Sequence, residues 1–294
     1  MEMLKWKIGD VTVTKIVESE LDSGLESLIA EATPEAVLPL TWMKPHFMTD
    51  AGALKMSFHA LVIETPTRKI LVDTCVGNDK PRAAVPFWDK LQLPFLQTLE
   101  RAGFTRDNID TVVCTHLHID HVGWNTMLVD GKWQPTFPKA RYLMGRTEFD
   151  YWKTEAEHSS PDEVFGALQI AVFSDSIRPV FEAGLVDLVE TDHRICEEVF
   201  LVPSPGHTPG HVSVRIASRG KKALITGDFV HHPCQLAHPD WAASVDYDRS
   251  QSTHTRETFF AELSADATLV IGTHWAGVTA GRIIRDGKAY RLET

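Results

Sequence analysis

The stretch that decides the fold is Thr115-His116-Leu117-His118-Ile119-Asp120-His121, which directly follows the largely apolar residues 109–114 (Ile-Asp-Thr-Val-Val-Cys). Such a run is typical of a short buried strand, and on extended backbone alternate side chains point to the same face. We therefore expect His116 and His118 to converge on one ion, and Asp120 and His121, beyond the turn, to reach a second. Imidazole and carboxylate ligands suit Zn, Fe, Mn, Ni or Co. The motif predicts a metal site at the end of a strand.

Three more candidate ligands stand near the ends of other apolar strands. His207 lies in a Gly- and Pro-rich turn, Asp228 follows 223–227 (Ala-Leu-Ile-Thr-Gly), and His274 follows 269–273 (Leu-Val-Ile-Gly-Thr). A lone histidine is more often a hydrogen-bonded structural residue than a ligand. The position that the three share, at the carboxyl end of a strand, makes metal binding the better interpretation.

The remaining pattern predicts a single α+β domain over residues 1–294. Residues 1–55 are expected to form an N-terminal strand and then an irregular excursion over the surface, which would cover either the site or a dimer contact. In each half, strands come before helices and no linker intervenes, which indicates β-rich layers packed together with helices outside. Strands are expected at 11–17, 59–63, 69–73, 109–115, 141–144, 198–203, 211–217, 222–227 and 268–272, and helices at 91–102, 148–182 and 255–263.

Composition and charge narrow the class of partner. The formal net charge is -11, whereas nucleic-acid binding normally depends on a basic face, so the expected partner is a small neutral or weakly charged molecule. The N-terminus has no secretory apolar region, and no apolar run approaches the roughly 20 residues that span a bilayer. The four cysteines are scattered and form no C-x-x-C pair. We therefore expect a reduced cytoplasmic protein that binds neither nucleic acid nor membrane.

Together these motifs resemble those of the metallo-β-lactamase superfamily. The matching pieces occur in the family's order across about residues 59–294. They are Leu71-Val-Asp-Thr74, Thr115–His121, Gly206-His-Thr-Pro-Gly-His211, Gly227-Asp228 and Gly272-Thr-His274. The resemblance implies the four-layer αβ/βα sandwich of the metallo-β-lactamase fold, with a centre of two metal ions.

The resemblance also implies seven metal ligands, three for each ion and one shared. They are His116, His118 and His207 for the first ion, Asp120, His121 and His274 for the second, and Asp228 between the two. Asp73 would orient a ligand histidine, with turn capping as its alternative role, and His211 would be a hydrogen-bonded structural histidine close to the ligands. The expected cofactors are two divalent ions per chain, zinc in the first place, with Mn, Fe, Co or Ni as alternatives.

Two close cations imply hydrolytic chemistry. A water shared between them loses a proton near neutral pH, because the two charges stabilise hydroxide. The hydroxide would attack a carbonyl or phosphoryl centre, and a metal would stabilise the developing oxyanion. Asp120, Asp228 and His231 are the predicted catalytic residues. A structural zinc site is usually closed by four protein ligands, so a binding protein with structural metal is the weaker interpretation.

Within the family, the residue three positions after Asp228 separates two branches. Acyl-homoserine lactonases commonly carry a tyrosine there, which helps to hold the substrate carbonyl, whereas this chain has His231. Gly227-Asp-Phe-Val-His231, together with Asp246-Tyr-Asp248, looks closer to the methyl-parathion-hydrolase-like enzymes, a branch that includes aryl-ester and lactone hydrolases. We predict a hydrolase of a lactone or carboxylic ester of a small apolar molecule. Organophosphate triester hydrolysis is the alternative, and β-lactamase or thioester hydrolysis stays open.

Aromatic residues follow three of the expected ligands. Trp124, Phe229 and Trp275 would form an apolar substrate pocket, or else they anchor the core, and the sequence favours neither role. The expected partner is a small-molecule substrate, and the formation of a homodimer is left open.

Overall fold

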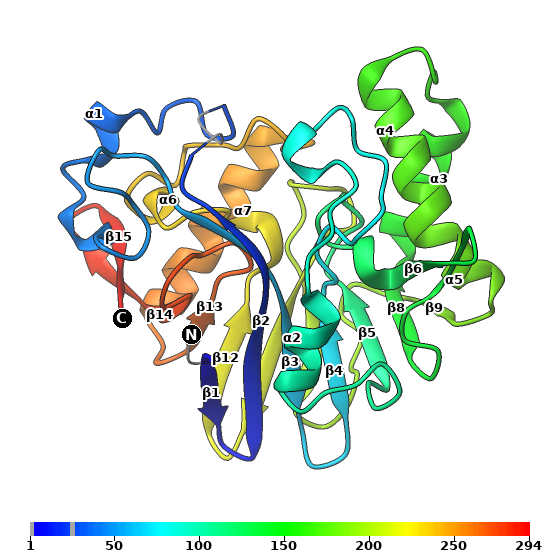
Figure 1. The fold of residues 1–294 in the computed structure, drawn as a ribbon. Coiled ribbons are helices and arrows are strands. Elements are labelled where there is room, and N and C mark those ends of the chain that lie inside the picture. The colour runs from blue at the N-terminus through cyan, green and yellow to red at the C-terminus, as the bar shows by residue number, and fades with distance from the viewer. Residues whose placement is uncertain (1–2, 24–26) are drawn as a thin grey trace. The chain divides into compact units, whose positions relative to one another are not determined.

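The computed structural model describes residues 3–23 and 27–294 and contains two compact units (Figure 1). Unit 1 comprises the N-terminal residues up to Glu18 together with Phe58–Thr191. Unit 2 comprises Ser19–Ser57 together with Asp192–Thr294. Mixed sheets and helices make up both units, which confirms the predicted α+β class.

Unit 1 is built on a seven-stranded sheet. Its strands, in spatial order, are β1 (Lys5–Ile8), β2 (Val11–Leu21), β3 (Met56–Glu64), β4 (Lys69–Val72), β5 (Thr111–Cys114), β8 (Arg141–Gly145) and β9 (Val186–Val189). The strands expected at 59–63 and 69–73 are confirmed as β3 and β4, which pair as an antiparallel hairpin with Leu61 opposite Val72. From β4 to β9 the neighbouring strands run parallel, so their carboxyl ends meet at one edge of the sheet. The 116–121 motif begins at that edge, directly after β5.

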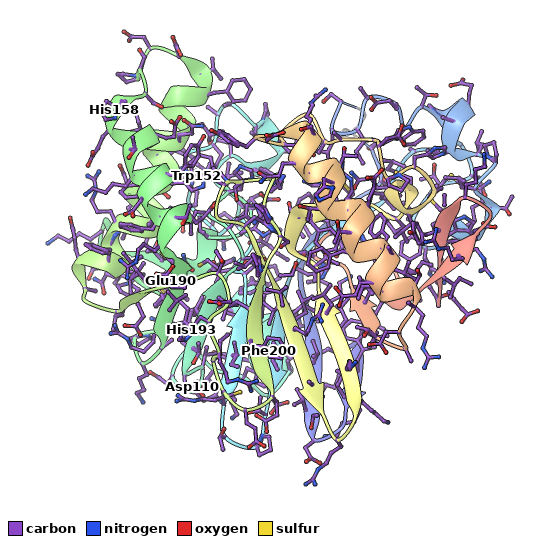
Figure 2. All side chains as sticks on the ribbon, turned by 180° about the vertical axis from the view of Figure 1, so that it is seen from behind. Asp110, Trp152, His158, Glu190, His193 and Phe200 are labelled. Carbon is purple, nitrogen blue, oxygen red and sulfur yellow. The ribbon has the colours of Figure 1, made fainter. Side chains whose placement is uncertain are left out.

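Helices of unit 1 follow the predicted helical stretches, with shifted ends. They are α2 (Phe95–Arg101), α3 (Arg146–His158), α4 (Val164–Val172), the π-helical turn η4 (Phe173–Ile177) and α5 (Arg178–Glu182). α2 begins later than predicted because the residue before Pro94 is disfavoured in a helix. α3 packs on β8 and β9 and lies beside α4, and Trp152 and His158 mark its course in Figure 2.

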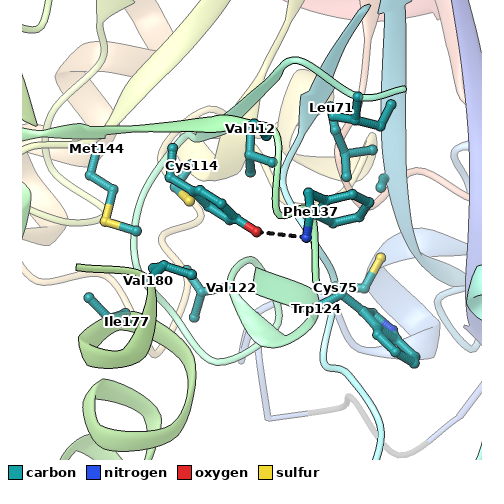
Figure 3. Close-up of a cluster of buried hydrophobic side chains, with 14 of the residues drawn as sticks. Leu71, Cys75, Val112, Cys114, Val122, Trp124, Phe137, Met144, Ile177 and Val180 are labelled. Carbon is teal, nitrogen blue, oxygen red and sulfur yellow. Dashed lines mark hydrogen bonds between the residues drawn. The ribbon is translucent and has the colours of Figure 1, made fainter. Parts of the chain in front are cut away.

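The core of unit 1 lies between the sheet and these helices. Figure 3 shows part of it, with Leu71 and Val112 of the sheet and Phe137, Ile177 and other buried side chains of the same cluster. Aliphatic residues of β4 and β5 therefore anchor in this core the strand that precedes the 116–121 motif.

One continuous helical stretch of unit 1, Val164–Glu182, is long and apolar enough to cross a membrane by length and composition alone. No apolar run of the sequence predicts such a stretch, whereas the helical stretch reaches this length because it continues through 174–176 (Ser-Asp-Ser). Core helices pass the same test, and Val172, Phe173, Ile177 and Val180 belong to the core of unit 1. The stretch is weak evidence for a membrane segment.

A cluster of buried charges lies beside this helix. Arg82 makes a bidentate ion pair with Asp175, with nitrogen–oxygen distances of 2.7 and 2.8 Å. Nζ of Lys80 donates to the hydroxyl of Thr126 at 2.5 Å and to the carbonyl of Asp175 at 3.0 Å. Burial lowers the pKa of Lys80 from 10.5 to about 7, although the charge of Asp175 acts in the opposite direction.

We expect this buried lysine to make stability rise with pH above neutrality. Between pH 7 and 10 the unfolded chain keeps the Lys80 proton while the folded chain releases it, so the free energy of unfolding increases with pH. Relative to Lys80→Met, the wild type should gain about 2 kcal/mol between pH 7 and pH 9. Urea unfolding at the two pH values measures the gain. The exposed Lys139→Met is the control, and parallel behaviour of wild type and Lys80→Met would contradict the prediction.

Unit 2 is built on a six-stranded sheet. Its strands, in spatial order, are β10 (Val199–Pro203), β11 (Val212–Ser218), β12 (Lys221–Ile225), β13 (Leu269–Ile271), β14 (Ala280–Asp286) and β15 (Ala289–Glu293). β12 and β13 run parallel, so the residues that follow them emerge at the same edge. The helices are α1 (Pro34–Val37), α6 (Cys234–Ala237) and α7 (Arg249–Ser264), and α7 packs on β14.

Several described residues of the segment 27–57 contribute apolar side chains to the core of unit 2. Val37, Met43 and Phe47 are buried in the same apolar cluster as Leu224 and Phe260. The apolar residues of this irregular segment therefore have a packing role that its broken pattern in the sequence concealed. That the segment covers a site or a dimer contact stays a prediction.

Outside the two sheets, residues 126–135 form a hairpin of β6 (Thr126–Val129) and β7 (Lys132–Pro135) in unit 1. Its two-residue turn, Asp130-Gly131, has φ values of 49° and 74°. Two successive positive φ values are what a type I′ turn requires, and Asp-Gly is a favoured pair for it. This hairpin follows the 116–121 motif closely in the chain.

Candidate metal centre

The first half-site belongs to unit 1 and consists of His116, His118, Asp120 and His121, which follow β5. Nε2 of His116 lies 3.1 Å from Nδ1 of His118, and Nε2 of His121 lies 3.8 Å from Oδ1 of Asp120. Two nitrogens that bind one tetrahedral zinc, each at about 2.0–2.1 Å, lie roughly 3.3 Å apart. The facing nitrogens of His116 and His118 therefore have the spacing of two ligands of one cation.

Asp73, which directly follows β4, holds His121 in a defined orientation. Nδ1 of His121 donates to Oδ2 of Asp73 at 2.9 Å, which leaves Nε2 of the ring as the ligand atom. Asp73 also accepts hydrogen bonds from the backbone N–H and the hydroxyl of Thr115, each at 2.8 Å. Its φ of 55° is in the left-handed region, which aspartate tolerates better than most residues. Asp73 thus links the ends of β4 and β5 and orients one imidazole.

We expect Asp73→Asn to weaken metal binding by about 10–100-fold, the usual cost of losing a carboxylate that orients a ligand histidine. The amide keeps the shape of the side chain but removes the negative charge that stabilises the N–H of His121. Competition with a chelating dye measures the affinity, with the exposed Asp107→Asn as the matched control. An affinity equal to that of the wild type would show that Asp73 is only a structural turn residue.

Glu148 and Trp152 of α3 support the same half-site, and sequence reasoning missed both. Oε1 of Glu148 accepts hydrogen bonds from the N–H of Leu117 at 3.1 Å and from Nε1 of Trp152 at 2.6 Å. The ring of Trp152, labelled in Figure 2, meets that of His118 edge-on with centroids 5.2 Å apart. A glutamate and a tryptophan four residues apart on a helix are common, so the sequence holds no signal for this role.

The second half-site belongs to unit 2 and consists of His207, Asp228 and His274. Asp228 is held in the 3₁₀ turn η5 (Gly227–Phe229) shortly after β12, and His274 lies shortly after β13. Nε2 of His274 is 3.1 Å from Oδ2 of Asp228, and Nε2 of His207 is 3.7 Å from the same oxygen. His231 is a third neighbour, with Nε2 3.4 Å from that oxygen. Three imidazoles therefore converge on one carboxylate oxygen.

The other ring nitrogens of the second half-site are engaged elsewhere. Nδ1 of His207 donates to Oδ1 of Asp246 at 2.9 Å, and Nδ1 of His274 faces the carbonyl of Ser57 at 3.4 Å. Both contacts favour the tautomer that leaves Nε2 without a proton and able to bind a cation. Burial raises the pKa of Asp246, but the hydrogen bond from His207 and the nearby guanidinium of Arg256 act in the opposite direction, and the net pKa lies well below its usual range. Asp246 is therefore an ionised acceptor.

His211 acts on the backbone that carries Asp228. Its Nε2 accepts a hydrogen bond from the N–H of Asp228 at 2.7 Å, while Nδ1 lies 2.9 Å from the carbonyl of Ser204. Close packing at this point also requires Gly227, because a Cβ there would meet the His211 ring at 2.6 Å. The structure therefore places His211 between two loops of unit 2, where it fixes the turn of η5.

His231 lies next to Asp228 as a buried, neutral imidazole. Burial lowers its pKa to about 3, although the charge of Asp228 acts in the opposite direction. Its Nδ1 is buried and makes no hydrogen bond to any of the described residues. His207, Asp228 and His231 also present ligand atoms within 4.8 Å of one another. The sequence predicted a catalytic role for His231, and its position is compatible with that role or with metal binding.

The donor set of both half-sites fits a zinc-type cation. Neutral imidazole nitrogens and carboxylate oxygens are the ligands that zinc and its neighbours among the transition metals take in proteins. Within each half-site the candidate ligand atoms face one another at 3.1–3.8 Å. Buried polar groups of this density are costly without compensation, and a bound cation would supply it.

The three aromatic residues that follow ligand positions are core side chains. Trp124 stacks on Phe95 with ring centroids 5.4 Å apart, and its Nε1 donates to Glu18 at 2.7 Å. Phe229 stacks on Phe259, with centroids 4.7 Å apart, and Trp275 is fully buried. These contacts favour the role of core anchors over the predicted substrate pocket. Trp124 belongs to the apolar core of unit 1, and Phe229 and Trp275 belong to that of unit 2.

Glu18 is a further buried carboxylate that the sequence did not single out. Its two oxygens accept hydrogen bonds from the N–H groups of Val76 and Gly77, at 2.9 and 3.0 Å, besides the bond from Trp124. Burial raises its pKa, partly offset by these hydrogen bonds. Glu18 thus connects the loop after Asp73 to the segment after His121 by hydrogen bonds, and so stabilises the backbone on both sides of the first half-site.

Comparison with protein families gives one match that spans both units. The model of the metallo-beta-lactamase superfamily matches residues 59–274, from β3 to the last of the candidate ligands. The matched stretch contains all seven residues of the two half-sites.

Comparison with individual proteins gives distant relatives. A probable metallo-hydrolase of Mycobacterium bovis is 25% identical over 196 residues, which cover 62% of this chain and 60% of the relative. An N-acyl homoserine lactonase of a Bacillus species is 24% identical over 197 residues, covering 62% and 67%. Thus the chain matches about three fifths of the length of the first of these curated relatives.

Among solved structures, AidC, described as a dizinc quorum-quenching lactonase in complex with a product, superposes with a TM-score of 0.79. The match covers 99% of this chain and 96% of that protein at 20% sequence identity. At this identity the likeness shows the fold alone, and the fold is the one predicted from the sequence.

Proposed function

The chain belongs to the metallo-beta-lactamase superfamily, and from that premise we propose that it is a metal-dependent hydrolase of a lactone or carboxylic ester of a small apolar molecule. The observation that carries the proposal is the convergence of imidazole and carboxylate ligand atoms within each half-site. In this proposal the two half-sites serve one pair of divalent ions, with Asp228 as the shared ligand.

Two bound divalent cations would lower the pKa of a water molecule and polarise the substrate carbonyl. The protein's contribution is to keep the ligand histidines neutral and the ligand aspartates ionised. Asp73 and Asp246 hold His121 and His207 in the tautomer that presents Nε2. Asp120 would accept a hydrogen bond from the attacking water, and Asp228 would offset part of the metal charge.

His231 would hold a proton close to the reacting atoms. Its Nε2 is 3.4 Å from Oδ2 of Asp228, and burial keeps the ring neutral. A neutral imidazole carries one N–H, so it is able to donate a hydrogen bond to the carbonyl oxygen of a substrate. In this proposal His231 takes the place that a tyrosine occupies in many lactonases.

The choice of a lactone or ester has two supports. Among the relatives are proteins named N-acyl homoserine lactonase, which suggests, at 24% identity, a cyclic ester as the starting point. The net charge of -11 disfavours strongly anionic substrates, because they would be repelled on approach. Phosphotriester hydrolysis stays the second candidate because His231 stands where many lactonases have a tyrosine. A different side chain would then contact the carbonyl or phosphoryl group of the substrate.

The test is an assay of the zinc-loaded protein against acyl-homoserine lactones, dihydrocoumarin and nitrophenyl esters. We expect turnover of at least one of them, abolished in Asp228→Asn prepared in the same way. Methyl parathion, nitrocefin and a thioester, compared by kcat/KM, separate the other hydrolase classes. Turnover of methyl parathion alone would move the assignment to the second candidate, and turnover of none of the lactones and esters would overturn the proposal.

A further inference from the structure

Arg256 of α7 is a fully buried arginine in unit 2 that no ligand pattern predicts. Its Nε donates to the carbonyl of Pro239 at 2.8 Å, and its terminal nitrogens donate to the hydroxyls of Ser252 and Thr253 at 2.6 and 3.0 Å. A guanidinium offers five N–H donors in a planar fork, so one side chain reaches several acceptors at once. Arg256 is therefore held in a single orientation.

Two further contacts of the same guanidinium lead to the second half-site. One terminal nitrogen lies 3.4 Å from Oδ2 of Asp246, whose other oxygen accepts the Nδ1 hydrogen of His207. The same nitrogen lies 3.3 Å from the carbonyl oxygen of Phe229, the residue after Asp228. Arg256 thus contacts the partner of one candidate ligand and the backbone next to another.

The rest of α7 supports the loop that carries His207. The hydroxyl of Thr255 donates to the carbonyl of Pro205 at 2.7 Å, and the N–H of Asp248 donates to the carbonyl of Gly206 at 2.9 Å. A Cβ on Gly206 would lie 2.3 Å from the backbone nitrogen of Ser252, so only glycine fits there. The His207 loop and the first turns of α7 are therefore packed backbone to backbone.

Asp246 is the residue through which loss of Arg256 would act on the metal centre. A buried carboxylate without a cationic neighbour is costly, and removing one member of a buried ion pair typically destabilises its surroundings. Without Arg256, Asp246 would retain the hydrogen bond from His207 and that from the N–H of Ala243, but not the positive charge. Asp246 would then be held by hydrogen bonds alone, and the orientation of His207 would be less tightly fixed.

We propose that Arg256 is a positioning residue for the metal centre, which holds His207 through Asp246 and Asp228 through the carbonyl of Phe229. The inference rests on the proposed function, because it takes His207 and Asp228 to be metal ligands. Arg256 itself is not one of the proposed ligands. Its effect is to keep two ligands, 21 positions apart in the chain, at the spacing that the structure shows.

The experiment compares the full-length wild type with Arg256→Met, Arg256→Lys and the control Arg249→Met, an exposed arginine at the start of the same helix. Zinc per chain and zinc affinity are measured by competition with a chelating dye, and the visible spectrum of the Co²⁺-loaded protein reports ligand geometry. We expect zinc binding about 10–100-fold weaker in Arg256→Met, an altered Co²⁺ spectrum, partial rescue in Arg256→Lys and no change in Arg249→Met.

The outcomes separate the two proposals. If the wild type binds no zinc, the proposed metal centre fails and the inference fails with it. If the wild type binds zinc and a folded Arg256→Met binds it equally well with the same Co²⁺ spectrum, only the inference is overturned. Should Arg256→Met fail to fold by circular dichroism, Arg256→Lys decides, because it keeps the charge but has a single donor group. Wild-type affinity and spectrum in Arg256→Lys would then also overturn the inference.

Discussion

Removal of divalent metal by a chelator is expected to abolish hydrolysis and to lower the thermal stability of the protein. The proposed ligands are imidazoles and carboxylates that face one another in two half-sites, and without cations the buried carboxylate of Asp228 is less well compensated. A metal at 100 times its dissociation constant stabilises the folded state by about 2.7 kcal/mol for each site. Activity and melting temperature, measured before and after chelation, test this expectation.

Restoration provides the control. Adding back Zn²⁺, Mn²⁺ or Co²⁺ to the chelated protein should recover activity and melting temperature together, and Mg²⁺ should not, because Mg²⁺ prefers oxygen ligands and binds imidazole poorly. A chelated and metal-free protein that keeps its full activity would exclude a metal-dependent mechanism. The order in which the metals restore activity indicates which one the site prefers.

The substitution Asp228→Asn is expected to give the largest effect of any single change. Oδ2 of Asp228 is the oxygen on which the Nε2 atoms of His207, His231 and His274 converge. An amide of the same shape has no negative charge and presents an NH₂ group or a weaker oxygen donor to a cation. We expect less than two zinc ions per chain and a fall in kcat/KM of more than about 100-fold, beyond the usual cost of losing a ligand's partner.

The matched control for that variant is Asp240→Asn, an exposed aspartate of the same unit. It makes the same chemical change, so a loss common to both variants would come from the change in net charge. Zinc content by elemental analysis and kcat/KM on the best ester substrate are the two measurements. A folded Asp228→Asn that holds two zinc ions and keeps wild-type kcat/KM would remove Asp228 from the centre.

The sequence predicted much of the fold because the decisive signals are local. The apolar runs of β5, β12 and β13 are short, and polar residues follow each of them closely. This pattern indicates buried strands whose carboxyl ends carry polar side chains at the edge of a sheet. The 116–121 motif itself follows β5 as bends and turns and not as extended backbone, yet Nε2 of His116 lies 3.1 Å from Nδ1 of His118. The hairpin of β3 and β4 was equally clear, since two apolar runs flank a turn containing proline.

Some elements were missed although the sequence contains a signal for them. The β6–β7 hairpin has the Asp130-Gly131 pair that favours a type I′ turn. α7 begins at Arg249, several residues before the predicted start, because Asp248 caps it by accepting the N–H groups of Ser250 and Gln251. The first turns of α7 lack an apolar stripe, so periodicity alone did not reveal them.

Other features have no local signal at all. Arg256, Glu148 and Glu18 are buried only because distant segments of their own unit surround them, and a charged residue in a helix or strand usually faces solvent. Likewise, the core role of Trp124 depends on Phe95 and Glu18, which are far away in the chain. These residues become recognisable only when the tertiary contacts are known.

The way in which each unit is assembled from two stretches of chain bears on biosynthesis. The core of unit 2 joins Val37 and Phe47 to Leu224 and Phe260, and all of Phe58–Thr191 is translated in between. The apolar side chains of the early segment therefore cannot pack until Leu224 and Phe260 have been translated. Until then they are exposed to other nascent chains. Contacts so distant in sequence close slowly, because long loops must first be ordered. Chaperone-assisted expression at low temperature should consequently raise the soluble yield more than it would for a chain whose units are contiguous.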